Sequence, residues 1–384
     1  MSELRKFVAP EIVYGTGAAE FAGQHARNLD ITNCLLVTDE GVSKQHWFPP
    51  ILESLSNEGI KYSIFASVSE NPREHEVMSG AEMYTANNCD GIVTIGGGSP
   101  MDCAKGIGIV TTNKQNILRF EGVDMVNNPI PPLVCIPTTA GSSADVSQFA
   151  IVTDTTRKVK IAIVSKAIVP DVALIDPYLT TTMDPQLTAA TGLDALTHAI
   201  EAYASNANSH ITDLFAKNAV GLVLKNLIGA INEPDNIEYR DGMMRASMEA
   251  GLAFSNAILG AVHAMAHSLG GLLDLPHGEC NAILLPLVID MNFSSAPERY
   301  IELAKTAGLQ VDDENDQEQW RRALVTALTE LKEAAGIHHT LEELGVTKAD
   351  LHALAQKALQ DPCMITNPAD LNEEEIVQIY ERAL

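Results

Sequence analysis

The first half of the chain alternates between short runs rich in β-branched residues and longer stretches with helical spacing. The short runs are bounded by turn residues and lie at 34–38, 62–65, 91–95, 133–136 and 172–175. Helical patterns over 47–59 and 75–87 separate the earlier runs. Strands that alternate with helices form a mostly parallel sheet covered on both faces, because each helix returns the chain to the same edge. We also expect a hairpin that pairs 149–152 with 159–164.

The second half is rich in helix formers and poor in proline. Twelve of the 18 prolines precede residue 190. Helical patterns then cover 187–204, 212–231, 240–254, 258–270 and 320–335. The sequence therefore predicts an all-helical second domain. Near Met183-Asp184-Pro185 the alternating strand and helix patterns give way to helical patterns alone. We therefore expect the two domains to comprise residues 1–183 and 184–384.

One stretch of the second half carries no charge. Ala250–Leu273 runs for 24 residues without Asp, Glu, Lys or Arg, which is long enough to cross a bilayer. It contains His263, His267 and four glycines, and it stands alone in an otherwise soluble sequence. A buried helix of a large domain explains this composition better than a membrane span.

The charge balance restricts the partners of this chain. Its 384 residues carry 25 basic and 50 acidic side chains, a net charge of −25. Nucleic-acid phosphates and anionic lipids repel such a chain, so we expect neither as a partner. No export signal follows Met1, and the six cysteines form no C-x-x-C pair. We therefore expect reduced thiols, a cytoplasmic location and a small-molecule partner.

A glycine-rich segment, Gly96–Lys105, follows a predicted strand and opens a helical pattern. Glycines let a backbone approach a ligand closely, and the N–H groups of a helix start attract anions. A phosphate or pyrophosphate fits such a place, although a plain strand-to-helix turn explains Gly96, Gly97 and Gly98 equally well. The segment also departs from the G-x-G-x-x-G fingerprint, because Met101 replaces the third glycine.

Asp39 stands at the end of the predicted strand at 34–38. A carboxylate there can accept hydrogen bonds from the ribose hydroxyls of an adenosine moiety. It would repel a 2′-phosphate ~4 Å away by roughly 4 kcal/mol per unit charge at an effective dielectric near 20, which favours NAD over NADP. The competing interpretation is a turn-forming aspartate.

The histidines suggest a divalent metal site. Asp194 and His198 are four residues apart on a predicted helix, and so are His263 and His267, while His277 follows in Pro-His-Gly. One carboxylate and several imidazoles suit Fe²⁺, Zn²⁺, Mn²⁺ or Ni²⁺. Spacing alone leaves open which four bind, because His263 and His267 are equally eligible.

A metal of this kind beside a nicotinamide indicates hydride chemistry. The ion is a Lewis acid that lowers the pKa of a bound hydroxyl, as it does for water. A metal-bound alkoxide next to NAD is a hydride donor ready to react.

Several motifs occur in an order that resembles the iron-dependent (group III) alcohol dehydrogenases. They are GGGSPMD at 96–102, PTTAG at 137–141, ATGLDALTHAIE at 190–201, GAVHAMAHSLGG at 260–271, PHG at 276–278 and NP at 367–368. The resemblance covers essentially the whole chain. It implies a Rossmann-like NAD-binding domain over 1–183, a helical metal-binding catalytic domain over 184–384 with dehydroquinate synthase-like architecture, an active site in the cleft between them, and a homodimer.

The resemblance also assigns individual residues. The metal ligands that it implies, for Fe²⁺ with Zn²⁺ as the alternative, are Asp194, His198, His263 and His277. It places His267 near the nicotinamide and the substrate, where this residue relays the proton released by alcohol oxidation. The cofactor contacts that it implies are Asp39, Gly97, Gly98, Ser99, Thr138, Thr139, Lys160 and Leu179.

The chain departs from the family pattern at two places. Ser142-Ser143-Ala144-Asp145 replaces the common Thr-Gly-Ser-Glu, and Ala369 stands where an arginine often follows Asn-Pro. The first departure lies beside the cofactor and puts the choice of substrate in question. Phe149, Phe254 and Cys363 are apolar pocket candidates, and they favour a short aliphatic primary alcohol.

The leading hypothesis is therefore NAD-dependent oxidation of short-chain primary alcohols to aldehydes, and the reverse reduction. A 1,2-diol or polyol dehydrogenase of the same family is the alternative. A dehydroquinate synthase-type lyase is a weaker one, because a phosphorylated substrate needs Lys and Arg that the His motifs lack. The third alternative is a metal-binding or sensory protein that has no catalytic activity.

Overall fold

The computed structural model describes residues 6–384, which form two compact units. One unit comprises Val8–Met183 and the other Asp184–Leu384. Residues 6 and 7 group with the second unit, whereas the sequence placed them in the first domain. The second unit begins with a capped helix, because Asp184 accepts a hydrogen bond from the Leu187 N–H (2.8 Å) and Pro185 occupies the first turn.

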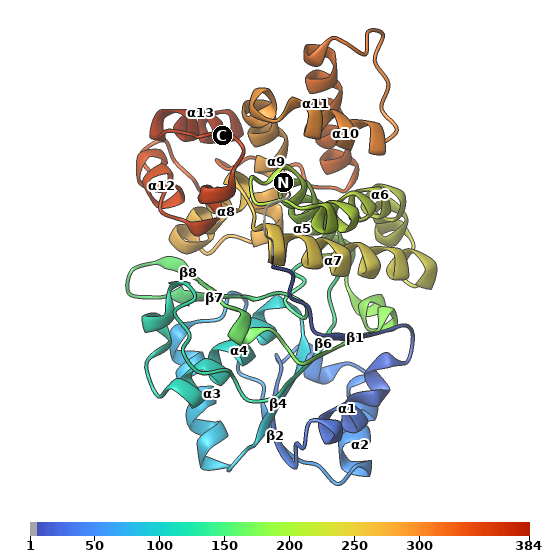
Figure 1. The fold of residues 1–384 in the computed structure, drawn as a ribbon, viewed down its shortest axis with the longest axis vertical. Coiled ribbons are helices and arrows are strands. Elements are labelled where there is room, and N and C mark those ends of the chain that lie inside the picture. Colours follow the sequence, from blue (N-terminus) through green and yellow to red (C-terminus); the bar gives the residue numbers. More distant parts are fainter. Residues whose placement is uncertain (1–5) are drawn as a thin grey trace. The chain divides into compact units, whose positions relative to one another are not determined.

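The first unit contains a six-stranded parallel sheet among the described residues (Figure 1). In spatial order its strands are β1 (Glu11–Tyr14), β9 (Val172–Ile175), β6 (Leu133–Pro137), β4 (Gly91–Gly96), β2 (Asn33–Val37) and β3 (Lys61–Phe65). Every pair of neighbours runs parallel. The predicted Rossmann-like α/β unit is therefore confirmed.

Helices cover both faces of this sheet. They are α1 (Ala22–Asn28), α2 (Phe48–Asn57), α3 (Glu74–Ala86) and α4 (Gly98–Asn113). Successive side chains of β2 point to opposite faces: Leu35 joins the core with α3 and α4, whereas Leu36 joins the core with α1 and α2. This two-sided burial explains why the strands read as continuous apolar runs.

The predicted hairpin is present, but it belongs to a separate sheet. β7 (Phe149–Asp154) pairs antiparallel with β8 (Val159–Val164), and β5 (Gly122–Val123) pairs parallel with β8. The sequence analysis missed β5, whose two residues carry too little pattern, and β1, whose residues are exposed or only partly buried and begin with a charged Glu11.

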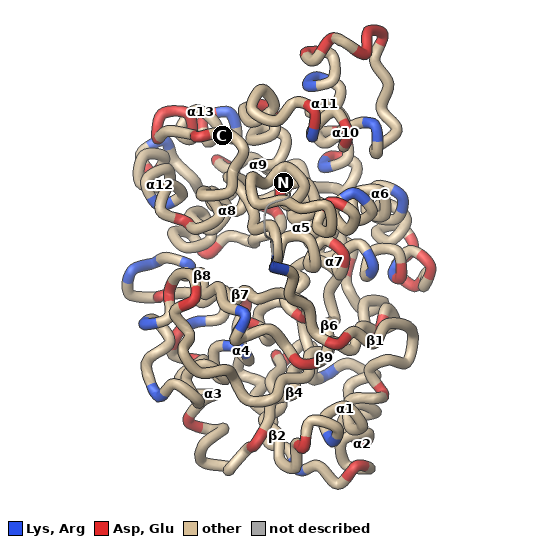
Figure 2. Tube along the Cα trace, viewed as in Figure 1, with Lys and Arg blue, Asp and Glu red and all other residues tan. Residues whose placement is uncertain are grey.

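The second unit is helical throughout its described residues, as predicted (Figure 1). Its α-helices are α5 (Pro185–Ala204), α6 (His210–Asn232), α7 (Ile237–Ala257), α8 (Ala261–Leu273), α9 (His277–Asn292), α10 (Pro297–Thr306), α11 (Gln317–Ala334), α12 (Leu351–Ala358) and α13 (Glu373–Ala383). The acidic cluster at 312–318 lies in the exposed loop before α11 and at its start, where Figure 2 shows red segments.

The uncharged run Ala250–Leu273 comprises two helix segments, as the separate helical patterns at 240–254 and 258–270 indicated, and not the one buried helix that its composition suggested. It comprises the end of α7, a break at 258–260 and α8, and the two helices meet at 99°. Ile258 has φ +62° at the break, a conformation that a β-branched residue rarely adopts. The run is mostly buried, so the expected burial is confirmed.

Another helix has the length and hydropathy of a membrane span. This helix is α6, and 39% of its most apolar window is buried. Core helices of soluble proteins meet the same criteria, and α6 packs along α5 and α7. Its composition is therefore weak evidence for a membrane.

Candidate functional site

The cofactor residues that the resemblance implies lie mostly at one edge of the parallel sheet. Asp39 follows β2, Gly97 and Gly98 follow β4, and Thr138 and Thr139 follow β6. The carboxyl ends of parallel strands meet at the same edge, so the fold brings these residues together within the first unit. The chain order reverses between β2 and β4, which is where open α/β sheets bind nucleotides.

The glycine loop approaches its neighbour closely. A Cβ atom at Gly98 would lie 2.9 Å from the Ser142 Cβ, which real side chains essentially never allow. Gly98 is also the first residue of α4, a helix of 16 residues whose starting N–H groups favour an anion. Glycine at residue 98 is therefore required by packing against Ser142 of the unusual Ser142–Asp145 segment, and the helix start beside it offers N–H groups to an anion.

Asp39 forms a turn, and this role does not exclude binding of a cofactor ribose. Its Oδ1 accepts a hydrogen bond from the Val42 N–H at 2.8 Å, and the side chain remains partly exposed. A carboxylate has two oxygens, so Oδ2 is available for ribose hydroxyls.

The remaining three cofactor candidates have partners of their own within the first unit: they are Ser99, Lys160 and Leu179. The Ser99 hydroxyl accepts from the Asn71 N–H (3.3 Å), and the Lys160 Nζ donates to the Asn71 Oδ1 (2.7 Å). Asn71, which the sequence analysis missed, therefore joins the glycine loop to β8. Leu179 follows β9 at the expected edge, but its side chain is buried among the residues that pack on α1 and α2.

The metal-ligand candidates converge in the second unit. The Nε2 atoms of His198, His263 and His277 lie 3.8, 3.5 and 3.8 Å from one atom, the Asp194 Oδ1. Asp194 and His198 share one face of α5, His263 lies on α8, and His277 is the first residue of α9. Three helices thus aim three imidazole nitrogens at one carboxylate oxygen.

His267 lies beside this cluster, and its ring is held by another carboxylate. Its Nδ1 is 2.8 Å from the Asp361 Oδ2, and its ring stacks on that of His277 with centroids 5.2 Å apart. One ligand atom each of His267, Asp361 and the buried Cys363 lie within 4.8 Å of one another, so these residues form a second group that could hold a metal ion. The geometry therefore separates His267 from the residues that surround Asp194 Oδ1.

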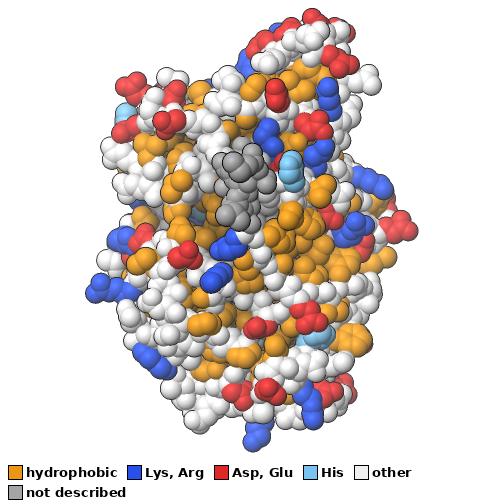
Figure 3. Space-filling model, in the orientation of Figure 1, with side chains coloured by type: hydrophobic (Ala, Val, Ile, Leu, Met, Phe, Trp, Pro, Cys, Tyr) orange, Lys and Arg blue, Asp and Glu red, His pale blue; other side chains and the backbone are white. Residues whose placement is uncertain are grey.

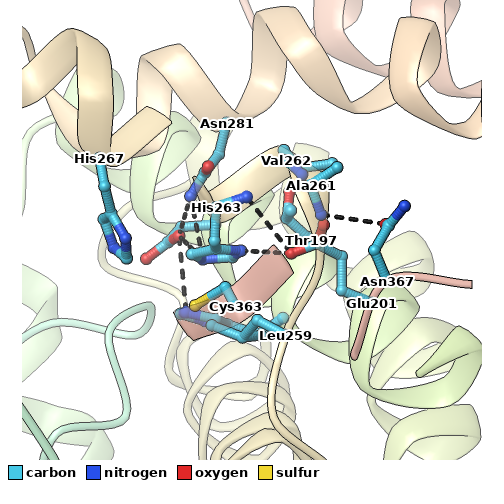
Figure 4. Close-up of polar contacts among 12 residues, drawn as sticks. Thr197, Glu201, Leu259, Ala261, Val262, His263, His267, Asn281, Cys363 and Asn367 are labelled. Carbon is cyan, nitrogen blue, oxygen red and sulfur yellow. Dashed lines mark hydrogen bonds and ion pairs between the residues drawn. The ribbon is translucent and has the colours of Figure 1, made fainter. Parts of the chain in front are cut away.

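Asn281 on α9 points toward His263 (Figure 4) and contacts three residues of the Asp194 cluster. Its Nδ2 donates to the Asp194 Oδ1 at 2.7 Å and lies 3.1 Å from the His263 Nε2 and 3.2 Å from the His277 Nε2. An ionised carboxylate can only accept, so the atom facing it is the amide NH₂. The Asn281 Oδ1 is buried and has no partner among the described residues.

Burial and charge shift the pKa values in opposite directions here. Burial raises the pKa of the Asp194 carboxyl, but the charges of the surrounding histidines and a hydrogen bond from His263 outweigh it and hold that pKa far below its ordinary value. Burial lowers the pKa of His263, yet Asp194 and Glu201 together raise it to about 9. The site therefore keeps its carboxylate ionised by placing positive charge next to it.

The donor set suits a divalent cation. One ligand atom each of Asp194, His263 and His277 lie within 4.8 Å of one another, so these three residues could hold an iron or zinc ion. The His198 Nε2 lies 3.8 Å from the Asp194 Oδ1 but falls outside that group. The His277 side chain is 27% exposed whereas that of His263 is 1% exposed, so the cluster is open on one side. Binding of the cation would replace the imidazole protons that balance Asp194.

Three residues of this neighbourhood were missed by the sequence analysis. Glu201 lies seven residues after Asp194 on the same face of α5, a spacing that could have revealed it. Asn281 lies four residues after His277 on α9, with the same kind of signal. Asp361 lies in an irregular segment, and only the tertiary structure brings it to His267.

Comparisons with known proteins agree with the motifs. The family model described as "Iron-containing alcohol dehydrogenase" matches residues 9–177, and "Fe-containing alcohol dehydrogenase family, C-terminal" matches residues 188–384. The 1,3-propanediol dehydrogenase of Klebsiella pneumoniae is 40% identical over 380 residues, or 98% of each chain. The NAD-dependent methanol dehydrogenase of Bacillus methanolicus is 35% identical over 378 residues, covering 98% of this chain and 99% of that protein.

A solved structure extends the likeness to the fold. The crystal structure of a 1,3-propanediol oxidoreductase has a TM-score of 0.96 to this chain, with 39% sequence identity and coverage of 100% of both chains.

Close packing of α9 on α5 sets the position of His277. A Cβ atom at Gly278 would lie 2.4 Å from the backbone oxygen of Ala190. Gly278→Ala should therefore push the start of α9 away from α5 and weaken Zn²⁺ binding at least about tenfold, measured by competition with a chelator. Gly221→Ala, on α6 where the added methyl meets open space, is the control. Unchanged affinity in Gly278→Ala would contradict this account.

Proposed function

The chain belongs to the iron-containing alcohol dehydrogenase family, and from that premise we propose that it oxidises short-chain primary alcohols to aldehydes with NAD as hydride acceptor, and catalyses the reverse reduction. The observation that carries the proposal is the convergence of three imidazole Nε2 atoms on the Asp194 Oδ1. The glycine loop and Asp39 at the sheet edge support a dinucleotide as the second reactant.

We assign the metal ligands as Asp194, His198, His263 and His277, with Fe²⁺ as the ion and Zn²⁺ as the alternative. A bound ion of this kind polarises an alcohol hydroxyl and lowers its pKa. The side chains themselves orient the site: Phe254 stacks on the His198 ring at a centroid distance of 4.3 Å and restricts its rotation.

We assign His267 as the proton relay. The Asp361 carboxylate accepts from the Nδ1–H of His267 at 2.8 Å, which directs the Nε2 away from Asp361. An imidazole held in one tautomer is ready to accept the alcohol proton at Nε2. His267 and Asp361 are both largely buried, so this hydrogen bond is protected from water.

The surroundings favour a small, uncharged substrate. Phe254 is 3% exposed and Cys363 is 1% exposed, and both lie next to the histidines. Diols remain the second candidate, because relatives named 1,3-propanediol dehydrogenase match the whole chain.

We assign the cofactor contacts to Asp39, Gly97, Gly98, Ser99, Thr138, Thr139, Lys160 and Leu179. Ser99 and Lys160 share the partner Asn71, so a phosphate bound at the glycine loop would lie within one hydrogen-bonded set.

We further propose a cytoplasmic homodimer. All six cysteines are buried and none forms a disulfide, as expected in a reducing compartment. On α6, Ile211 is 51% exposed and Leu214 is 73% exposed. Figure 3 shows apolar side chains gathered on the face of the protein that it displays. A second copy would cover such side chains. Sedimentation equilibrium should give twice the chain mass of 41.2 kDa, and a monomer mass would exclude the dimer.

Two histidine variants separate metal binding from proton transfer. His263→Ala should lose the metal and NADH formation together, because it removes a ligand. His267→Ala should keep the metal while the rate falls by about 10²–10⁴. The measurements are metal content after anaerobic loading with Fe²⁺ and NADH absorbance across a panel of primary alcohols and diols. If metal-loaded wild type oxidises no member of the panel, the proposed activity is wrong.

The charge of Asp39 should decide the cofactor. Asp39→Asn keeps an oxygen for the Val42 N–H but removes the repulsion of a 2′-phosphate. We expect kcat/KM with NADP to rise by at least about tenfold relative to NAD. Asp124→Asn, at an exposed position outside the sheet edge, should leave that ratio unchanged. Equal ratios in wild type and Asp39→Asn would remove Asp39 from the cofactor site.

A further inference from the structure

A buried carboxylate, Glu201, connects two helices of the metal cluster. It lies on α5 one turn beyond His198 and is 7% exposed. Its Oε1 accepts from the Val262 N–H at 2.7 Å, and its Oε2 lies 2.6 Å from the His263 Nδ1 (Figure 4). The same Oε2 is 3.4 Å from the His263 backbone nitrogen. One side chain of α5 therefore holds both the backbone and the ring of a residue on α8.

We propose that Glu201 is the positioning residue of the metal site: it fixes the His263 ring in the tautomer and orientation that present Nε2 to the cation. This inference rests on the proposed metal site and deepens it. Glu201 does not touch the cation or the substrate in this assignment, since it acts through the His263 ring.

The tautomer follows from which groups can donate. An ionised carboxylate only accepts, so the short contact to Glu201 requires a proton on the His263 Nδ1. Neutral imidazole carries one proton, and Nε2 is then the nitrogen with a free lone pair. That nitrogen is the one that lies 3.5 Å from the Asp194 Oδ1, on the side where the other ligands converge. Carboxylate–histidine pairs commonly orient metal ligands in this way.

The same contacts fix the helices. Asp194, His198 and Glu201 occupy positions i, i+4 and i+7 of α5, so one helix face carries two ligands and the carboxylate that places a third. The Glu201 carboxylate accepts a hydrogen bond from a buried N–H group at the start of α8. The N-terminus of a helix stabilises such a negative charge. The distance between α5 and the His263 ring is therefore set by hydrogen bonds on both sides of that ring.

Other contacts hold the turn before α8 without Glu201. The Thr366 Oγ1 donates to the Leu259 backbone oxygen at 2.6 Å, and the Asn367 Oδ1 accepts from the Ala261 N–H at 3.0 Å. Replacing Glu201 alone thus leaves the α7–α8 turn anchored.

The test is Glu201→Gln. The glutamine oxygen can still accept from the Val262 N–H, but its NH₂ then faces the His263 Nδ1 and requires the opposite tautomer. We expect affinity for Zn²⁺ and Co²⁺ to fall about 10- to 100-fold, measured by chelator competition, and the visible Co²⁺ absorption spectrum to change. The metal-free variant should keep the wild-type circular dichroism. Wild-type affinity and an unchanged Co²⁺ spectrum would overturn the proposal.

A matched control separates positioning from the general loss of a buried charge. Glu249→Gln removes a buried carboxylate of α7 that accepts from the Asn218 Nδ2 at 2.6 Å, away from the histidines. It should leave metal affinity within about twofold of wild type, because no ligand ring contacts it. A fall equal to that of Glu201→Gln would assign the effect to stability and overturn the proposal.

A measurement on wild type keeps the test valid if Glu201→Gln does not fold. In Zn²⁺-loaded protein with ¹⁵N-labelled histidine, NMR should place the ring proton of His263 on Nδ1, and a proton on Nε2 would overturn the proposal. The proposed metal site fails separately: in that case wild type itself binds no divalent cation, or His263→Ala binds it as well as wild type.

Discussion

The helical unit depends on one buried charge. The Asp194 carboxylate lies among three helices, 5% exposed, and an isolated carboxylate in such a place would be neutralised by protonation. Three imidazoles aimed at its Oδ1 prevent this, and a divalent cation would compensate the same charge more completely. The Asn281 amide donates to the same carboxylate, and Glu201 holds one of the imidazoles that face it.

In the sheet unit the governing constraint is geometric. Parallel strands end at a common edge, so residues from 39 to 139 reach one place although they are distant in sequence. A glycine at residue 98 allows the chain to pass close to residue 142, and the start of α4 adds backbone N–H groups at this edge. The proposed dinucleotide site at this edge combines the backbone N–H groups of a helix start with the Asp39 carboxylate and with polar side chains such as Ser99 and Lys160.

Much of this architecture could be predicted from the sequence, because alternating strand and helix patterns and the four-residue spacing of Asp194 and His198 are local signals. The separate patterns at 240–254 and 258–270 indicated a break between α7 and α8. Its 99° angle and the positive φ of Ile258 could not be predicted, because only the surrounding contacts impose them. Spacing could not separate His263 from His267 either. What distinguishes them is the carboxylate that each meets, Glu201 or Asp361, and those pairs join residues 62 and 94 positions apart.

The division of the chain has a consequence for how such an enzyme diversifies. All four proposed metal ligands lie in the helical unit, and all eight proposed cofactor contacts lie in the sheet unit, each with its own internal packing. Substitutions that change the preferred nucleotide and substitutions that change the preferred ion therefore lie in different units. Their changes in the free energy of unfolding should add. A lineage can alter one preference while the other stays under unchanged selection, which allows a single scaffold to explore many pairings of cofactor and metal.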